Sequence, residues 1–432
     1  HESRIAPACA MHPFHIRHPD IYMRTAWLLC CAVGLTPAAW ADPVSFSEAL
    51  ARAGSDAPAI AARQAAADSA RLLVKPAGQL PDPQLALSID NYPISGPDRF
   101  RLNRDEMTML NVGVMQDVPS EASRRAREGL ARAEVTASLA AIDITRLEAQ
   151  LAAANAWLEA FYAERRVAIL MSLAGDAAAL EQATTASFST GAGKPDAVLS
   201  ARLQSARLED RISDAKFEAA AARVELERWI GPLGQDTLGP SPPDFVIDPA
   251  ALRAHIEHHV EVAGSSASIA RAQAEMEQAR ASREPDLSWS VMYGRRDPAF
   301  GDMLSFGLKF SLPLFQSDRQ SPTIDARRAD VRRAEADRET VLREHRAMLE
   351  AKLAEHDLLT RRLSRSREVV LPLAKERESV ASAAHASGTL DLAELFAMRL
   401  EVKEVELERL DLERRLALVD VYLALEYGEA QS

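Results

Sequence analysis

Two turns of the chain are each followed by acidic residues that could cap a helix or attract a cation. Asp196 follows the segment 190–195, and Asp391 follows the segment 386–390, with Glu394 three residues later. We expect both aspartates to begin helices, where a carboxylate accepts hydrogen bonds from free backbone N–H groups. The spacing of Asp391 and Glu394 is that of a capping box. Clustered carboxylates also attract cations, so the residues alone leave both interpretations open.

Histidines form a second candidate group. His255 and His259 have the i, i+4 spacing that can place two imidazoles on one helix face and bind a divalent ion. Glu257 and His258 lie between them, but the order His-Glu-x-x-His is absent. The segment should be a solvated helix beside a linker. We therefore interpret these residues as a polar surface cluster and predict no metal ligands.

Other motifs do not point to catalysis. Residues 191–194 are similar to part of a phosphate-binding loop, but Phe188 stands where the first glycine should be, and Pro195 replaces the serine or threonine. The chain has no Gly-x-Ser-x-Gly motif, and its 3 cysteines all precede residue 42. We predict a protein that is not an enzyme and that uses no cofactor.

The elements that position these residues occur twice, about 195 to 200 residues apart. Four landmarks return in the same order: residues 83–89 as 285–291, residues 112–119 as 306–313, Gly193 and Asp196 as Gly388 and Asp391, and residues 227–231 as 425–428. The chain is therefore predicted to contain two structural repeats, 42–231 and 250–428. A proline-rich linker, 232–249, joins them.

The start of the chain has the features of an export signal. Residues 23–41 combine Arg24, a short apolar run at 26–35 and a small-x-small site ending at Ala41, which is the pattern of a secretory signal peptide. Residues 1–22 lack periodicity, and we interpret them as a mis-assigned upstream extension. The formal net charge of −12 argues against a nucleic-acid partner.

Composition and spacing favour long helices. Only 18 of the 432 residues are glycine and 5% are aromatic. We expect helices over the segments 46–80, 119–191, 249–283 and 322–386. The two longest should kink near Gly175 and Pro372. The segment 395–423 has apolar residues at 3-4 spacing, broken only by Arg409, which is typical of a coiled coil.

Four segments alternate apolar and small or polar residues, as strands do: 84–90, 109–118, 286–293 and 304–312. Such a repeat suits either a half-buried sheet or a barrel wall between lipid and water. The export signal and the long helices favour the barrel wall. We then expect Trp289, Tyr293, Phe306 and Phe310 to form a lipid-facing girdle. The alternative is an aromatic stripe in a core.

Four strands cannot close a membrane barrel, because the smallest known barrels have about eight. An open sheet edge cannot lie in hydrocarbon either. The strands must therefore be shared between chains, and three copies would supply about twelve. The predicted fold is mainly α with a small β part, in which a trimeric barrel continues into a helical tube.

From residue 42 to residue 428 the chain resembles the TolC-type outer-membrane efflux factors. The resemblance rests on the duplicated strand pairs and on the turns at 190–196 and 386–394. It implies a homotrimer with a 12-stranded β-barrel in outer-membrane lipid and an α-helical coiled-coil tunnel in the periplasm. Such a channel is a passive exit duct, and it binds a periplasmic adaptor (membrane fusion) protein and an inner-membrane RND pump.

Two short motifs, at 80–83 and 91–93, most resemble the heavy-metal cation efflux (CzcC/CusC-like) branch. Many members of that branch carry a lipidated cysteine at the mature start. No cysteine stands near Asp42 in this sequence, so the resemblance does not imply a lipid anchor.

The resemblance also assigns roles to the turn residues. In the family, acids after the glycine turn form a constriction at the periplasmic mouth, which implies an acidic ring of Asp196, Asp391 and Glu394. A helix-turn-helix tip needs a permissive backbone. The residues that would serve the turns and contact the adaptor are Gly191, Gly193, Gly388 and Thr389.

We therefore predict the outer-membrane channel of a tripartite RND-type efflux system for heavy-metal cations. The alternatives within the family are a channel for drugs or other organic solutes, or for type I secretion. A periplasmic adaptor would have one helical hairpin flanked by lipoyl-like and barrel domains. A coiled-coil structural protein or adhesin would lack the two turns and the duplication.

Overall fold

The structure is a computed structural model that describes residues 43–102, 104–191, 193–233 and 237–428. These residues belong to one unit of the chain. The predicted upstream extension, 1–22, and the predicted signal peptide, 23–41, lie outside the described residues.

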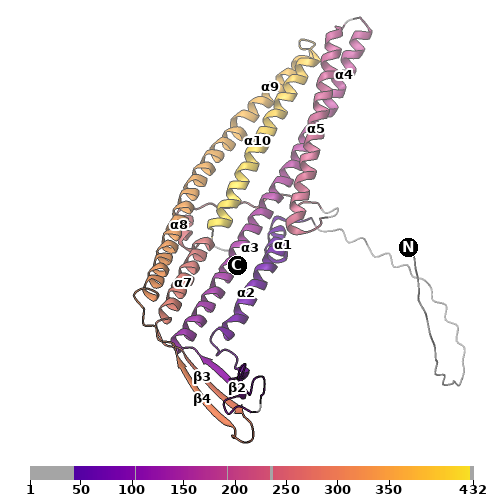
Figure 1. Cartoon of the computed structure of the whole chain (residues 1–432). Coiled ribbons are helices and arrows are strands. Elements are labelled where there is room, and N and C mark those ends of the chain that lie inside the picture. Colours follow the sequence, from indigo (N-terminus) through magenta and orange to yellow (C-terminus); the bar gives the residue numbers. More distant parts are fainter. Residues whose placement is uncertain (1–42, 103, 192, 234–236, 429–432) are drawn as a thin grey trace, which may run out of the picture. The chain divides into compact units, whose positions relative to one another are not determined.

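Both halves of the described chain have the same order of elements (Figure 1). The first half contains α1 (Phe46–Asp56), α2 (Pro58–Ala77), β1 (Gln84–Asp90), β2 (Met109–Val118), α3 (Glu121–Ser172), α4 (Ala174–Ser189) and α5 (Pro195–Ile230). The second contains α6 (Pro249–His255), the 3₁₀ helix η1 (Ile256–His258), α7 (Val260–Ala281), β3 (Leu287–Arg295), β4 (Met303–Phe310), α8 (Gln320–Arg365), the π-helix η2 (Ser366–Val370), α9 (Leu371–Ala386) and α10 (Leu392–Tyr427). This is the order that the duplication predicts.

The strands form one antiparallel sheet in the order β1-β2-β3-β4. Each half contributes a pair of neighbouring strands, and the halves meet between β2 and β3, which pair from Leu110↔Arg295 to Val118↔Leu287. In Figure 1 the sheet lies at one end of α2, α3, α7 and α8, and the α4–α5 and α9–α10 turns lie at the other end of the helices. The helices therefore separate the strands from the acidic turns.

Helix α3 is the central element of the first half. It has 52 residues, a length of about 78 Å at 1.5 Å per residue. Its start is capped by Ser120, whose side chain accepts a hydrogen bond from the backbone N–H of Ser123 at 3.1 Å. α3 packs against α2, α5, α7 and α10, and buried alanines such as Ala153 and Ala154 let these neighbours approach closely. Among the helices of the described residues, none is both long and apolar enough to cross a membrane.

Both long helices are interrupted near the predicted positions. The first breaks at Leu173, between α3 and α4 and just before Gly175. In the second, the π-helical turn η2 precedes α9, and Pro372 lies in the first turn of α9. Proline lacks an N–H, and its ring displaces the carbonyl four residues earlier. The regular α-helical hydrogen bonds therefore cannot continue through Pro372.

Two helices that we expected to be continuous are divided. The segment 46–80 breaks at Ala57, which is extended (φ −62°, ψ 127°) because it precedes Pro58. The segment 249–283 breaks at His259, which is also extended (φ −57°, ψ 141°). The ring of His259 accepts a hydrogen bond from the backbone N–H of Glu261 and so caps α7.

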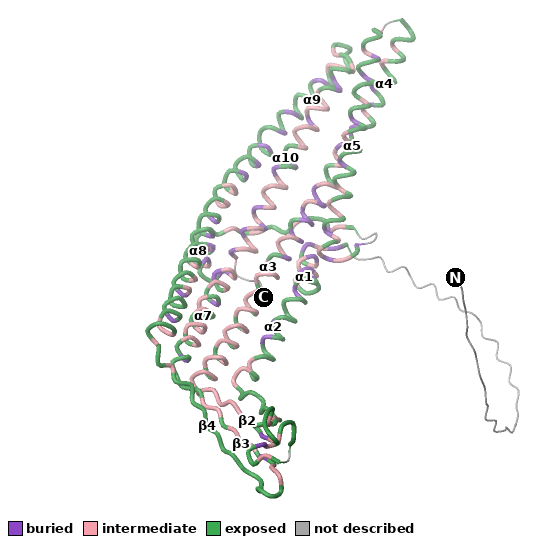
Figure 2. The backbone as a smooth tube through the Cα atoms, viewed as in Figure 1, coloured by how far each residue is buried: buried purple, intermediate pink, exposed green. Residues whose placement is uncertain are grey.

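The core is a series of seams between helices, and Figure 2 shows buried positions following the helices. One seam surrounds Trp157 of α3, which is fully buried. Phe46 meets this ring edge-on at 5.6 Å, and Phe161 stacks on it at 5.2 Å. A buried indole N–H needs a partner. Trp157 donates to the backbone oxygen of Val44 at 3.0 Å, which ties the residues before α1 to α3.

Helix α10 has two apolar faces. The coiled-coil positions Leu412, Val419 and Leu423 pack with residues of α8, as the 3-4 spacing predicts. Leu410 and Val421 lie outside that spacing and belong to the seam around Trp157. α10 therefore lies between helices of the two halves, which one heptad pattern could not indicate.

Candidate functional site

Apolar side chains from all four strands share one face of the sheet. Leu87 is opposite Val112, and Val112 is opposite Tyr293. Directly opposed residues point to the same side of a sheet, and every second residue along a strand does so as well. The register therefore defines an apolar sheet face with these members: Leu85, Leu87, Ile89, Leu110, Val112, Val114, Leu287, Trp289, Val291, Tyr293, Leu304, Phe306, Leu308 and Phe310. Gln116 and Arg295 lie on the same face, near the two ends of the strands.

This face is exposed, although it is strongly apolar. Phe306 is 75% exposed and Leu87 is 73% exposed. Soluble monomers rarely leave an apolar patch of this size uncovered. All four predicted girdle residues, Trp289, Tyr293, Phe306 and Phe310, lie on it. The apolar sheet face is therefore built to be covered by lipid or by another apolar surface.

The opposite face of the sheet is less apolar, with small and polar residues interspersed with Met109, Met115, Met292 and Met303. Its members include Ser88, Asn111, Ser290, Ser305 and Lys309. A sheet with one apolar and one polar face suits a boundary between lipid and water. The alternation in the sequence predicted both faces correctly.

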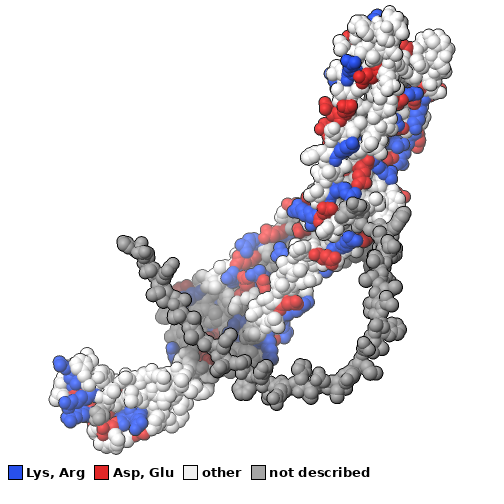
Figure 3. Space-filling model, turned by 90° about the vertical axis from the view of Figure 1, so that its right-hand side faces the viewer, with Lys and Arg blue, Asp and Glu red and all other residues white. Residues whose placement is uncertain are grey.

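The size of the sheet and the charges around it also suit a bilayer. The strands have 7 to 10 residues, close to the roughly 9–11 of a membrane-spanning strand. Charged residues gather in the loops 91–108 and 296–302. Figure 3 shows a charged end, then a nearly uncharged band, then the mixed charges of the helices.

The sheet has two open edges among the described residues, on β1 and on β4. An open edge presents unpaired N–H and C=O groups, and each such group costs several kcal/mol in hydrocarbon. A membrane location therefore requires strands from other chains at both edges.

In the turn between α9 and α10, a glycine ends the first helix and a side-chain cap begins the second. The backbone N–H of Thr389 donates to the oxygen of Ala384 at 2.9 Å, which closes α9. Asp391 accepts from the N–H of Glu394 at 2.7 Å, and the N–H of Asp391 donates to the Glu394 carboxylate at 3.5 Å. This confirms the predicted capping box. Both acidic residues remain exposed.

Asp196 does not cap α5, contrary to our expectation. The capping position is Lys194, and Pro195 is the first residue of α5, so Asp196 lies inside the first turn. Proline is pre-set for the first helical position, where its missing N–H costs nothing. Asp196 is exposed, and its charge interacts favourably with the N-terminal end of the helix dipole. It lies on a different turn from Asp391 and Glu394.

Both turns need their glycines. Gly191 and Gly388 have φ of 78° and 77°, which residues with a side chain rarely adopt. A Cβ at Gly193 would lie 2.7 Å from the backbone nitrogen of Phe188. Turn geometry therefore accounts for these glycines, and contact with an adaptor stays a prediction.

Arginines connect α10 to helices of both halves. Arg399 forms an ion pair with Asp176 in α4 and lies 3.5 Å from Glu378 in α9. Arg211 in α5 makes a bidentate pair with Glu404 in α10, at 2.6 and 3.3 Å. We did not predict these links, because no local spacing in the sequence relates residues so far apart.

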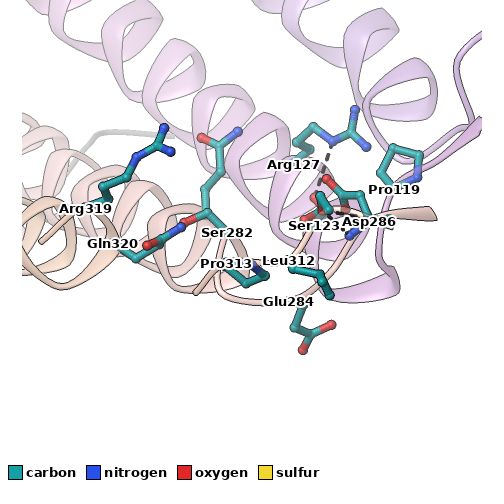
Figure 4. Close-up of a pocket in the computed structure, with 12 residues that line it drawn as sticks. Pro119, Ser123, Arg127, Ser282, Glu284, Asp286, Leu312, Pro313, Arg319 and Gln320 are labelled. Carbon is teal, nitrogen blue, oxygen red and sulfur yellow. Dashed lines mark hydrogen bonds between the residues drawn. The ribbon is translucent and has the colours of Figure 1, made fainter. Parts of the chain in front are cut away.

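A groove of about 500 Å³ lies where the sheet joins the helices. Figure 4 shows Ser123 and Arg127 of α3 beside Asp286, with Arg319 and Gln320 lying further along the groove. The carboxylate of Asp286 accepts a hydrogen bond from the backbone N–H of Ser120 at 2.7 Å, which ties the start of α3 to the segment that leads into β3. We interpret the groove as a structural junction between the halves.

The histidine segment is only in part the surface cluster that we predicted. Glu257 and His258 are exposed, but His259 is 5% exposed and faces inward. Its Nε2 lies 3.2 Å from Oε1 of Glu426, and its ring centroid lies 3.9 Å from that of His345. The sequence spacing could not find this group, because the helix breaks at His259 and the partners come from α8 and α10.

Comparison with known proteins adds a family match over part of the chain and a fold. Residues 252–425 match the family described as outer membrane efflux protein, whereas no curated protein matches the chain. CusC is 16% identical, with a TM-score of 0.73 over 90% of this chain and 93% of CusC. The Campylobacter jejuni CmeC outer membrane channel is 13% identical, with a TM-score of 0.73 over 90% and 86%. The Vibrio cholerae outer membrane protein VceC is 16% identical, with a TM-score of 0.70 over 89% and 96%.

These findings define the class of protein. The fold is that of the outer-membrane channels, long helices with a small sheet, as predicted. The match of residues 252–425 to the outer membrane efflux protein family covers less than half of the chain, and it agrees with the expected outer-membrane location. CusC, CmeC and VceC have closely similar TM-scores, so the fold does not select the heavy-metal branch.

Proposed function

We propose that three copies of the chain form the outer-membrane duct of a tripartite exporter. The apolar sheet face together with the open edges of β1 and β4 carries this proposal. Pairing β4 of one copy with β1 of the next removes every open edge, and three copies then give about twelve strands. The apolar face would contact lipid, and the face with Asn111 and Ser290 would line water.

The helices would continue this barrel as a tunnel into the periplasm. Their far ends carry the two glycine turns (Figure 1), where a periplasmic adaptor would bind Gly191, Gly193, Gly388 and Thr389. The exposed acids Asp196, Asp391 and Glu394 would form the acidic ring at this mouth. The duct itself would be passive, and an inner-membrane RND pump would supply the energy.

Heavy-metal cations are the cargo that we propose. Support comes from the motifs at 80–83 and 91–93 and from the acids of the turns. Both motifs flank β1 and have structural roles there: the oxygen of Pro81 accepts from the Gln116 side chain at 2.7 Å, and Asn91 has a φ of 55°. The left-handed φ of Asn91 explains that residue type without reference to cargo, whereas the Pro81 contact uses a backbone oxygen that any residue supplies. The cargo therefore needs its own test.

Cysteine cross-linking tests the assembly, because no cysteine lies after residue 41. Phe306→Cys in β4 is combined in turn with Leu85→Cys, Leu87→Cys and Ile89→Cys in β1, all on the apolar sheet face. If β4 pairs with β1 of a neighbouring chain, one of the three cysteine combinations should form disulfides between chains when outer membranes are mildly oxidised. On a non-reducing gel, this combination should show cross-linked species of up to three chains and no larger ones.

The control is Leu87→Cys with Val112→Cys, which are opposed within one chain. It should oxidise without forming a ladder. Monomers in every β1–β4 combination, together with oxidation of the control, would exclude the shared barrel.

A further inference from the structure

We infer that His259, His345 and Glu426 form a binding site for one divalent ion of the zinc type. The site lies at the start of α7, in the middle of α8 and near the end of α10. One ligand atom from each residue lies within 4.8 Å of the other two. The site is buried: His259 is 5% exposed, His345 is 8% exposed, and the Glu426 side chain is 8% exposed.

The contact between His259 and Glu426 has a length that suits two ligands of one metal ion, and it does not have the geometry of a hydrogen bond. Nε2 of His259 lies 3.2 Å from Oε1 of Glu426. Within the described residues, however, neither this Nε2 nor Oε2 of Glu426 makes a hydrogen bond. Zinc ligands at about 2.0–2.1 Å in tetrahedral geometry lie about 3.3 Å from one another. The two groups therefore have the separation of neighbouring ligands on one ion.

The donor set indicates the kind of ion. Two imidazoles and one carboxylate suit zinc, cobalt, nickel and copper, and leave a fourth position open for water. Magnesium and calcium prefer oxygen ligands only. The Glu426 carboxylate lies against the His259 ring, which supplies no positive charge while it is neutral, and a divalent ion would supply that charge.

His345 is held in a way that favours metal binding. Its Nε2 lies 3.0 Å from the Glu261 carboxylate, which can accept the Nε2–H as in carboxylate–histidine–metal arrangements. That leaves Nδ1 for the ion. The Tyr427 hydroxyl lies 3.2 Å from Nδ1, and the backbone oxygen of His345, at 3.3 Å, offers it another acceptor.

Binding would change the tautomer of His259. Its Nδ1 accepts a hydrogen bond from the N–H of Glu261 at 3.2 Å, so the neutral ring carries its proton on Nε2 when no metal is bound. Coordination through Nε2 moves this proton to Nδ1 and breaks the bond to Glu261. The site would therefore couple a metal ion to the start of α7. This ion is a ligand of the helical part and is independent of the cargo.

The site is tested by measuring the metal content of the protein after it has been purified from membranes in detergent and stripped of metal with EDTA. After dialysis against zinc chloride, the wild-type protein should retain zinc that Glu426→Gln and His345→Gln lose, with affinity falling at least about tenfold. The matched control is His255→Gln with His258→Gln, on the same segment but outside the site, and it should bind like the wild type. Apart from the substituted positions the variants have the same sequence, so histidines elsewhere in the chain cannot cause a difference between them.

A second measurement covers variants that fail to fold. Cobalt chloride added to the wild-type protein should give the strong visible absorption of four-coordinate cobalt, and excess zinc should abolish it. Only the weak spectrum of hydrated cobalt, or equal zinc retention in folded Glu426→Gln, His345→Gln and wild type, would overturn the site. The cross-linking result does not depend on either outcome.

Discussion

Val114 in β2 lies directly opposite Val291 in β3, so backbone hydrogen bonds join the two halves of the chain at the centre of one sheet. Both valines belong to the apolar sheet face. Because opposed residues point to the same side, the register of this central pair aligns the apolar residues of the first half with those of the second. A shift of one residue would turn one half's apolar residues to the polar side.

The first prediction concerns this face. Phe306→Arg should destabilise the membrane-inserted protein by about 2–4 kcal/mol if Phe306 lies near the bilayer midplane, because a charge there must leave water. Urea titration of the protein folded into lipid vesicles measures the change. Its control is Ser305→Arg, one residue away on the polar face, which already carries Lys309. Equal destabilisation by the two variants would show that Phe306 does not face lipid.

Much of the fold could be predicted because it depends on local patterns. The alternation from Leu304 to Phe310 predicted the strand and its two faces, and Pro372 predicted the break in the long helix. Breaks at Ala57 and His259 were missed. Pro58 offered a signal for the first, since a residue before proline avoids the helical conformation, whereas the second depends on a tertiary environment that buries His259.

The candidate sites were predictable only in part, because only some of their contacts join residues that are close in the sequence. Asp391 and Glu394 are three residues apart, so their capping box could be read from the sequence. His345 and Glu426 lie far from His259 in the sequence and meet it only through the packing of α7, α8 and α10. No spacing rule brings such residues together.

The second prediction is a pH dependence centred on Asp420 in α10. Burial, with a smaller contribution from the negative charge of Asp244, raises the pKa of Asp420 from its ordinary value near 3.8 to about 7. His356 also faces it, with Nε2 3.3 Å from Oδ1. Between about pH 4 and about pH 7 the folded protein therefore holds a proton that the unfolded chain has lost. The stability contributed by this group is complete below about pH 4 and is lost as the pH rises towards 7.

Asp420→Asn removes that titration. Melting temperatures in detergent should therefore fall less between about pH 4 and about pH 8 for the variant than for the wild type. Asp357→Asn is the control, because Asp357 is exposed and pairs with Arg361 at 2.7 Å. It should leave the pH dependence unchanged. Parallel curves for Asp420→Asn and wild type would contradict a protonated Asp420 in the fold.

The third prediction separates capping from charge at the turns. Asn caps a helix about as well as Asp, so Asp391→Asn combined with Asp196→Asn and Glu394→Gln removes the charges while retaining the cap at Asp391. If these acids form a ring at the mouth, single-channel recordings in planar bilayers should show a lower preference for cations over anions. Asp214→Asn, which removes an exposed acid from α5 away from the turn, should not change it. An unchanged preference in the triple variant would leave the acids with structural roles alone.

The last prediction concerns the cargo. The outer-membrane fold is common to CusC, CmeC and VceC, so only a phenotype can separate metal cations from organic solutes. Deletion of the gene should sensitise cells to copper, silver, zinc, cobalt or cadmium salts more than to lipophilic drugs, and a plasmid copy should restore tolerance. Complementation with the Phe306→Arg variant should fail if the membrane-inserted duct is what confers tolerance, whereas Ser305→Arg should succeed. Unchanged metal tolerance together with lower drug or dye tolerance would assign the duct to organic solutes and leave its architecture as described.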